Sequence, residues 1–227
     1  MALDIAFFRR VMGQFTTGVT IVTTSSQEGI AGLTVNSFTS VSLNPMLVLV
    51  CVDQRSQSLP FFRAGGVFAV NILSEEQEAL SNCFSSSSDE RYNYFCHARH
   101  HVAATGAPIL EGTLGFVDAR ITAEYPGGDH VMFLGQVEAM GYDGHAFFLP
   151  GISASQSTLP APVGAADLLS SNGHASSNGL SGNNGHTRAE HEHASPLLYY
   201  RGKYHHLSNH YQHQRTELLP ATKQHDQ

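Results

Sequence analysis

Two short stretches of the sequence carry the residue types needed to bind a flat, phosphorylated ring. The first runs from Gly32 to Pro45, GLTVNSFTSVSLNP, and interleaves hydroxyl and amide side chains with apolar ones. Because alternate residues of an extended chain face opposite ways, one face can pack while the other offers hydrogen-bond donors. The second, QRSQSLPFF, places Ser56 and Ser58 near the start of an expected helix, where free N–H groups favour an anion. An ordinary serine cap beside Arg55 is the alternative interpretation.

Together these stretches suit a flavin nucleotide, which joins a flat ring to a phosphate. Donors near N1 and the C2 carbonyl favour the reduced ring, because negative charge gathers there.

Other common signatures are absent from the sequence. There is no GxGxxG after a strand, no GxxxxGK(S/T) and no GxSxG. The net charge of −7, without any Lys/Arg run, disfavours nucleic-acid binding. No apolar run approaches the roughly 20 residues that span a bilayer, so no membrane association is expected. His100–His101, His191–His193 and His205–His206 could bind a metal adventitiously, but none has zinc-finger spacing, and no metal site is predicted.

The sequence has three cysteines, Cys51, Cys83 and Cys96, which is an odd number, and no two of them form a CxxC motif. A disulfide framework is therefore not expected, and a reduced, cytoplasmic location fits better. The N-terminus has no cleavable apolar segment, which agrees with that location. Cys51 lies in the apolar run MLVLVCV and is expected to be a small buried hydrophobe rather than a reactive thiol.

The elements that would position these residues are mostly strands. The residue patterns predict helices over 3–15, 56–65 and 75–84, and strands over 19–24, 46–53 and 67–73. Ser74 and Gln77 form a capping box for the third helix. The strand 46–53 is apolar without alternation, so it is expected to be covered on both faces.

A polar-tipped hairpin and a mainly β fold follow from the second half of the chain. Residues 117–124 alternate, with apolar side chains on one face and Asp118, Arg120, Thr122 and Glu124 on the other. PGGDH is a turn and VMFLGQVEAM returns as the second strand. LLYYRGKY is predicted as one last short strand. Many short strands with few helices predict a closed or nearly closed antiparallel barrel.

The chain is expected to form a single domain with one long interruption. Residues 1–150 and 196–207 would make up the domain, because 227 residues supply one substantial core. Residues 151–195 are rich in Ser, Gly and Asn and are interpreted as a low-complexity, disordered insert. Residues 208–227 are interpreted as a frayed polar tail. The insert is expected to be inert, the alternative being a loop that shields the site or contacts a partner.

At this point the sequence resembles the flavin reductase-like family, the short-chain reductases of two-component monooxygenases. The matching blocks, in order, are FRRVMGQFTTGVTIVTT, GLTVNSFTSVSLNPMLVLVCVDQRSQSLPFF, FAVNILSEEQEALSNCF, GAPILEG, AEYPGGDHVMFLGQVEA and PLLYYRGKYHHL. The resemblance implies a split β-barrel with a few short helices, usually a homodimer. It implies that NADH or NADPH reduces FMN or FAD, and that the reduced flavin passes to a flavin-dependent monooxygenase.

Carried over residue by residue, the resemblance implies a flavin site on two strands and the following turn. The residues that would line the flavin ring or lie beside it are Thr34, Val35, Asn36, Ser37, Ser40, Cys51, Val52 and Asp53. Ser56 and Ser58 would hold the phosphate. Each assignment has a packing alternative, such as an edge-strand threonine or a turn-forming aspartate.

The resemblance also implies a nicotinamide side. His130, in GGDH, is the catalytic candidate that would face the nicotinamide, and Tyr200, Arg201 and Tyr204 of YYRGKY would lie near that opening. Two functions remain open beside the reductase. One is a flavin-binding electron carrier or sensor without nicotinamide activity, and the other is an oxidase with tightly held FMN on the same barrel.

Overall fold

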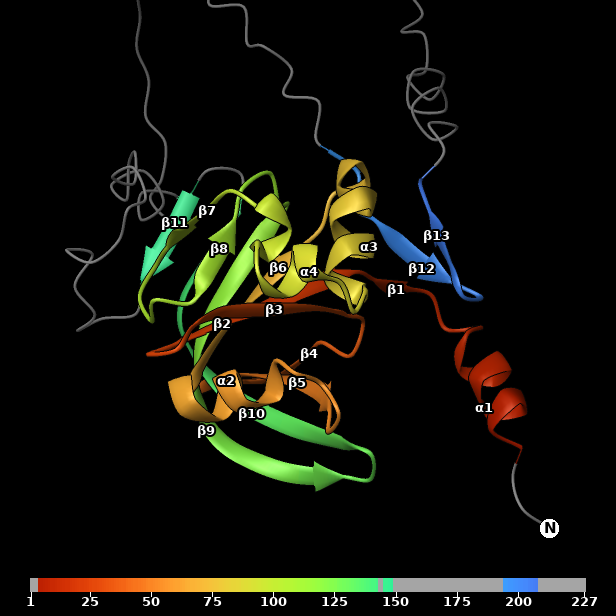
Figure 1. Ribbon diagram of the computed structural model, residues 1–227, viewed down its shortest axis with the longest axis horizontal. Coiled ribbons are helices and arrows are strands. Elements are labelled where there is room, and N and C mark those ends of the chain that lie inside the picture. The colour runs from red at the N-terminus through yellow and green to blue at the C-terminus, as the bar shows by residue number, and fades with distance from the viewer. Residues whose placement is uncertain (1–3, 143–144, 149–193, 208–227) are drawn as a thin grey trace, which may run out of the picture.

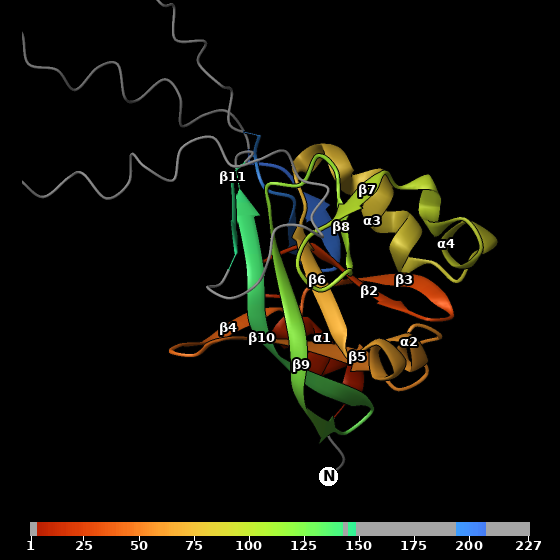
Figure 2. The same ribbon diagram turned by 90° about the vertical axis from the view of Figure 1, so that its left-hand side faces the viewer.

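One antiparallel sheet of eight strands forms the centre of the molecule (Figures 1 and 2). The structure is a computed structural model and describes residues 4–142, 145–148 and 194–207. The strands, in spatial order, are β3 (Gly29–Val35), β2 (Thr20–Ser26), β6 (Val67–Ile72), β9 (Gly115–Gly127), β10 (His130–Tyr142), β5 (Met46–Asp53) and β4 (Thr39–Leu43), with β11 (His145–Phe148) also paired to β10. The predicted mainly β class is confirmed.

Two small sheets complete the strands. They are β1 (Thr17–Gly18) with β12 (Leu198–Tyr200) and β13 (Lys203–His205), and β7 (His100–Val102) with β8 (Pro108–Leu110). The chain after residue 194 therefore returns to the N-terminal half, because Val19 N donates to Leu197 O and Leu197 N donates to Leu73 O. The predicted insert, apart from residues 194–195, and the predicted tail lie outside the described residues.

The helices are few and short, as predicted. They are α1 (Ile5–Met12), α2 (Leu59–Gly65), α3 (Glu78–Ser85) and α4 (Asp89–Tyr92), with 3₁₀ turns η1 (Glu75–Gln77) and η2 (Phe95–His97). Asp4 caps α1 through the Ala6 N–H, and Gly13 ends it. The capping box of Ser74 and Gln77 is confirmed, although it opens η1 rather than a continuous helix. None of the helices in the described ranges is long and apolar enough to cross a membrane.

Aromatic packing fixes the helices against the sheet. Phe62 of α2 is fully buried and stacks on Phe133 of β10, with ring centroids 5.5 Å apart. On the other side, Phe84 of α3 meets Phe95 edge to face at 5.0 Å. Each such buried side chain contributes roughly 1.5–3 kcal/mol by leaving water. In Figure 1, α2 and α3 lie on opposite sides of β3.

The strand β5 corrects one expectation. Its residues alternate between buried and half-exposed, so it is covered on one face only and the prediction of two covered faces is wrong. Val52 points into the core, whereas Cys51 and Asp53 are half-exposed. The apolar run misled because Leu47 and Leu49 lie on the accessible face, where apolar residues are common on protein surfaces.

Two further expectations are corrected. LLYYRGKY forms a hairpin, β12–β13, rather than one strand, because Arg201 and Gly202 adopt φ of 49° and 77° and reverse the chain. Asp118, placed by its alternation on the solvent face, is fully buried and accepts a 2.8 Å bond from Thr105 N. The surrounding loop supplies the donors that make its burial tolerable.

The cysteines also differ from expectation. Cys83 of α3 and Cys96 of η2 form a disulfide, and Cys51 is the free thiol of the described chain. Pairs of cysteines bridge when the fold brings their Cα atoms within about 7 Å, and sequence separation gives no measure of that. The expectation of three reduced cysteines is therefore wrong.

Candidate functional site

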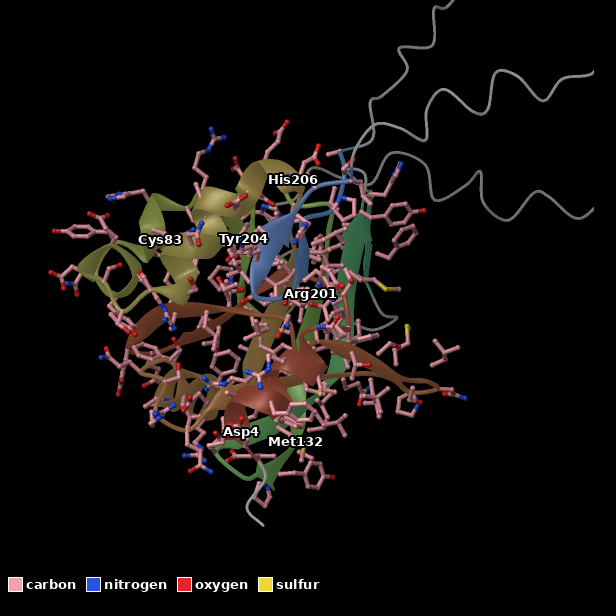
Figure 3. All side chains as sticks on the ribbon, turned by 90° about the vertical axis from the view of Figure 1, so that its right-hand side faces the viewer. Asp4, Cys83, Met132, Arg201, Tyr204 and His206 are labelled. Carbon is pink, nitrogen blue, oxygen red and sulfur yellow. A yellow bond between two sulfur atoms is a disulfide. The ribbon has the colours of Figure 1, made fainter. Side chains whose placement is uncertain are left out.

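A pocket of about 380 Å³ lies where β3, α3 and the β12–β13 hairpin meet. Four of the residues predicted for the site, Thr34, Val35, Asn36 and Tyr204, line it, together with Val19, Asn82, Ser85, Tyr199 and Gly202. These residues come from segments far apart in the sequence. Figure 3 shows the hairpin that carries Tyr204 lying against the helix that carries Cys83.

The hydroxyl of Thr34 is engaged within the protein. Its Oγ1 donates to the carbonyl of Ser81 at 2.7 Å, and the Ser81 hydroxyl lies 2.8 Å from the hydroxyl of Tyr204. This chain of bonds joins β3, α3 and β13 around the pocket. Thr34 therefore positions the pocket wall.

Ser37 lies between β3 and β4, and its hydroxyl fastens this segment to β5 by hydrogen bonds. Its Oγ accepts from Cys51 N and donates to Cys51 O, each at 3.1 Å. Burial raises the pKa of the Cys51 thiol, and the smaller opposing effect of the Ser37 hydrogen bond does not reverse the direction. The thiol is therefore protonated at neutral pH and a poor nucleophile. Ser40 lies farther along on β4, exposed and paired with Val48.

The tip of the β9–β10 hairpin lies against the end of β5. Antiparallel pairing sets His130 opposite Asp53, and Gln54 N donates to Asp129 O at 3.0 Å. Hydrogen bonds from Arg55 hold the pKa of Asp53 far below its usual range. The neighbouring His130 ring lowers the pKa of Asp129, whose Oδ1 lies 2.7 Å from His130 Nδ1. Both carboxylates are ionised at neutral pH.

A second pocket, of about 160 Å³, surrounds Ser58 and a residue that sequence reasoning missed, Arg91. Ser58 is only 2% exposed, and its Oγ donates to Gly32 O at 3.3 Å and accepts from Arg91 Nη2 at 3.2 Å. Ser56 Oγ in turn accepts from Ser58 N at 3.3 Å. The Ser58 side chain does not cap α2, which is only seven residues long. Ser58 therefore lies beside the Arg91 guanidinium instead of capping the helix, and an anion site here stays a prediction.

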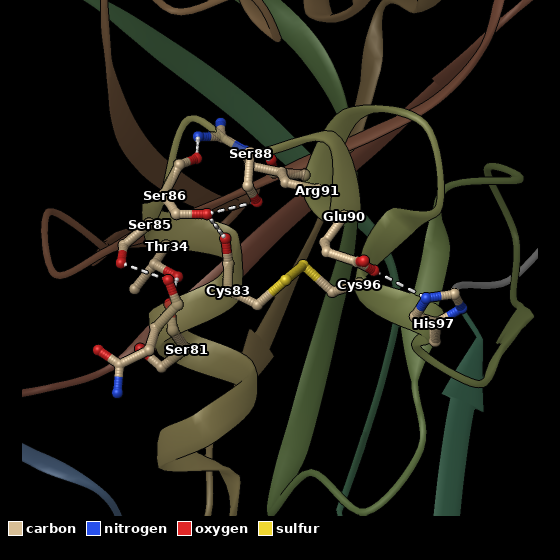
Figure 4. Close-up of a disulfide and its surroundings, with 12 residues drawn as sticks. Thr34, Ser81, Cys83, Ser85, Ser86, Ser88, Glu90, Arg91, Cys96 and His97 are labelled. Atoms are coloured by element: carbon tan, nitrogen blue, oxygen red, sulfur yellow. Dashed lines mark hydrogen bonds and ion pairs between the residues drawn. A yellow bond between two sulfur atoms is a disulfide. The ribbon is translucent and has the colours of Figure 1, made fainter.

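Arg91 is a buried cation surrounded by neutral acceptors. It is 9% exposed, with Nε donating to Gly32 O at 3.0 Å and Nη1 donating to Ser86 O at 2.9 Å (Figure 4). No carboxylate forms an ion pair with Arg91 within the described ranges. Burial lowers the pKa of the guanidinium, the direction expected of a cation without a counter-ion. Such a group attracts an anionic ligand to the pocket that it lines.

Arg201 lines a third pocket, of about 470 Å³, and Tyr200 lies beside it, with its hydroxyl 3.4 Å from Oε1 of the lining residue Gln14. Gly202 lines both this pocket and the first. Arg201 donates from Nε and Nη2 to Gln14 Oε1, at 3.1 and 2.8 Å, and its guanidinium lies 5.1 Å from the Tyr200 ring centre. Arg9 and Arg10 complete a basic lining. Among the described strands, β10, which carries His130, pairs with β5, β9 and β11 and not with the strands of the β12–β13 hairpin.

The chain belongs to the flavin reductase-like domain family, whose pattern it matches over residues 12–154. It is 36% identical to the reductase subunit HsaB of a flavin-dependent monooxygenase from Mycobacterium tuberculosis, over 61% of this chain and 72% of that protein. It is 38% identical to an NADH-dependent flavin reductase from a Rhodococcus species, over 60% of this chain and 77% of the relative.

Solved structures show the same relationship. A nitrilotriacetate monooxygenase component B homolog from Mycobacterium thermoresistibile aligns with a TM-score of 0.63 at 28% identity, covering 97% of this chain and 93% of that one. An NADH:FAD oxidoreductase from Streptomyces globisporus, solved with NAD and FAD fragments, aligns with a TM-score of 0.60 at 27% identity, covering 91% and 94%.

Proposed function

We propose that this protein is an NAD(P)H-dependent flavin reductase that reduces FMN or FAD and supplies the reduced flavin to a partner monooxygenase. The observation that carries the proposal is the placement of two pockets along one strand. Gly32 lies at the Ser58–Arg91 pocket, and Thr34 to Asn36 line the larger one. The rise of β3 from Gly32 to Thr34 is about 7 Å, comparable to the reach of a ribityl chain between ring and phosphate.

The relatives support the same function and favour NADH. They are named as NADH-dependent flavin reductase, as FMN reductase (NADH), and as reductase subunits of flavin-dependent monooxygenases. A flavin bound here would accept hydride from a reduced nicotinamide, which is the chemistry that the cofactors bring. What remains for the protein is to hold, orient and shield them.

The flavin side rests on backbone groups and one cation. The backbone from Thr34 to Ser37 and from Cys51 to Asp53 would border the ring, with Thr34 and Ser37 fixing its geometry through their own hydrogen bonds. Ser58 and Arg91 would hold the phosphate. Ser56 acts one step back by orienting Ser58. Val52 contributes its backbone alone, because its side chain is in the core.

His130 serves the nicotinamide side in this proposal. Asp129 holds Nδ1, so the opposite nitrogen, Nε2, would orient the carboxamide or supply a proton. Asp53, opposite in the β5–β10 ladder, joins this group to the flavin-bordering strand. Tyr204 borders the 380 Å³ pocket proposed for the flavin ring, the ring pocket. Arg201 lines the adjoining basic pocket, which would suit the phosphates of a dinucleotide, and Tyr200 lies beside that pocket through its hydrogen bond to Gln14.

The architecture proposed for this function is a split β-barrel in a homodimer. The sheet begins with β3 and ends with β4, which are consecutive in the chain, and Ser37 between them is bonded to β5. The helix α1 has no buried residue, and Phe7 and Phe8 on it and Phe15 just after it are more than half exposed. A second copy is the occupant we propose for that apolar surface. Residues 1–150 and 196–207 form one domain, since β12 pairs with β1.

The decisive assay mixes purified protein with NADH and either FMN or FAD and follows the loss of NADH absorbance. Turnover that depends on added flavin is the expected result. Since both nicotinamide nucleotides are cytoplasmic metabolites, the proposed location is the cytoplasm. Flavin binding without NADH oxidation would support the electron carrier instead, and absence of flavin binding in calorimetry would end the proposal.

A further inference from the structure

The segment that carries Arg91 is closed into a loop by a disulfide. Cys83 lies on α3 and Cys96 in η2, and the residues between them include Ser86 and Arg91 (Figure 4). We propose that this disulfide is a redox-sensitive clamp. It keeps Arg91 at the pocket lined by Ser58 and Arg91, the phosphate pocket, and its reduction lowers the affinity for phosphorylated flavins. The inference rests on the proposed function.

The backbone at the far end of the loop is strained. Phe95, Cys96 and His97 have φ values of 50°, 53° and 51°, in the left-handed region that non-glycine residues rarely adopt. Three consecutive residues in this region persist only where the surroundings impose the conformation. The disulfide at Cys96, in the middle of the three, is one such constraint. Its loss gives the segment a route to relax.

Few other contacts fix the loop from Ser86 to Tyr94. His97 and Glu90 pair at 2.8 Å, but their side chains are 71% and 59% exposed, and exposed pairs contribute little. Phe95 is the buried anchor, packed on Phe84. Arg91 attaches the loop to the core through its bonds to Gly32 and Ser58, whereas its bond to Ser86 lies within the loop. Burying a guanidinium without a counter-ion costs desolvation free energy. Once the loop is free to move, the Arg91 side chain is therefore expected to return to water.

The redox chemistry is ordinary thiol–disulfide exchange. A dithiol reductant attacks one sulfur of the pair, the S–S bond breaks to give a mixed disulfide, and the second thiol of the reductant resolves it. Two electrons and two protons pass to Cys83 and Cys96, and the reductant ends as a disulfide. Both cysteines are only partly buried, so a reductant can reach them. In cytoplasmic proteins disulfides are usually transient and redox-sensing, which is the behaviour proposed here.

The clamp acts on the phosphate pocket more than on the ring pocket. The ring pocket uses Thr34 to Asn36 on β3 and Tyr204 on β13, which lie outside the loop, and Ser85 at the end of α3 is its one lining residue between the two cysteines. Reduction is therefore expected to weaken FMN binding by about tenfold or more, the effect of losing one charge-assisted bond. Riboflavin, which lacks the phosphate, is expected to bind both forms with similar affinity.

The test titrates FMN and riboflavin fluorescence against full-length protein, before and after treatment with dithiothreitol. Alkylation and mass spectrometry establish the thiol state of Cys83 and Cys96. A Cys83→Ser, Cys96→Ser double variant is expected to match the reduced protein. The Arg91→Gln variant is expected to bind FMN weakly in both states, because the group on which the clamp acts is gone.

Several results would overturn the clamp. They are equal FMN affinity in the two states, an equal loss of FMN and riboflavin binding, alkylation of both cysteines in untreated protein, or an Arg91→Gln variant that still responds to reduction. The proposed function fails differently. In that case the oxidised protein binds neither flavin, whereas a protein that binds FMN equally in both states loses only the clamp.

Discussion

Replacing Arg91 by methionine is expected to affect flavin binding and folding in different ways. Methionine matches most of the arginine side chain in length but carries no charge. In the protein without flavin, the change leaves the Ser86 carbonyl without its Arg91 donor, at about 1–3 kcal/mol. It also removes a buried cation that has only neutral partners, which offsets a similar amount. The free energy of unfolding is therefore expected to change by less than about 1 kcal/mol.

With FMN the balance is different, because the phosphate would be the counter-ion that Arg91 lacks. Loss of a hydrogen bond between charged groups costs about 1.5–3 kcal/mol, which weakens binding roughly tenfold to a hundredfold. Riboflavin binding should stay within about twofold. Urea denaturation measures the first quantity and fluorescence titration the second. Arg63→Met is the matched control, since Arg63 lies on α2 and forms an exposed ion pair with Glu124 of β9. Wild-type FMN affinity in Arg91→Met, or a loss equal to that of riboflavin, would refute the reasoning.

Three other substitutions test separate parts of the structure. His130→Ala is expected to lower kcat/KM for NADH at least about tenfold with flavin affinity unchanged, and full turnover at saturating NADH would remove His130 from the catalytic role. Burial raises the pKa of Asp118, so its carboxyl favours the folded state at low pH and loses that contribution as pH rises through the folded pKa. Asp118→Asn should therefore raise Tm at pH 7 relative to pH 4, compared with wild type, and an unchanged pH profile of Tm would contradict this. Gly135→Ala would place a Cβ 2.6 Å from the Phe68 ring, and a loss of about 1–3 kcal/mol is expected in urea denaturation; unchanged stability would mean that the core relaxes freely.

Elements with strong local patterns could be predicted from the sequence. The strand Val67–Ile72 and the Ser74–Gln77 capping box follow from neighbours in the chain, and both are present. The hairpin turn at residues 201–202 was not predicted, because it begins with an arginine in the left-handed region of backbone conformation. Local propensity assigns that conformation to glycine or asparagine, so YYRGKY read as one strand.

Arg91 and the disulfide could not be predicted, because their partners are set by tertiary structure. Arg91 bonds to Gly32 and Ser58, which are 59 and 33 residues away in the chain. Its local sequence, SSSSDERY, is typical of a solvent-exposed segment, so nothing near it indicated burial. Cys83 and Cys96 are 13 residues apart without any characteristic motif. The resemblance implied that Ser58 holds the phosphate, but the positive charge beside Ser58 comes from Arg91 on α4.

Gly32 lies where the two pockets of the proposed flavin site both depend on the packing of α3 and the disulfide-closed loop against β3. Its carbonyl accepts from both Ser58 and Arg91, which places the phosphate pocket against β3. A Cβ at this position would lie 2.7 Å from the Phe84 ring and 3.4 Å from the Phe95 ring. Only glycine therefore lets α3 and η2, which the disulfide joins, pack this closely on β3. Two residues later, Thr34 bonds to Ser81 of the same α3 helix and sets the ring pocket. Because α3 also carries Cys83, the helix that shapes the ring pocket is covalently tied to the loop that delivers Arg91, and a substitution at Gly32 should disturb ring and phosphate binding together.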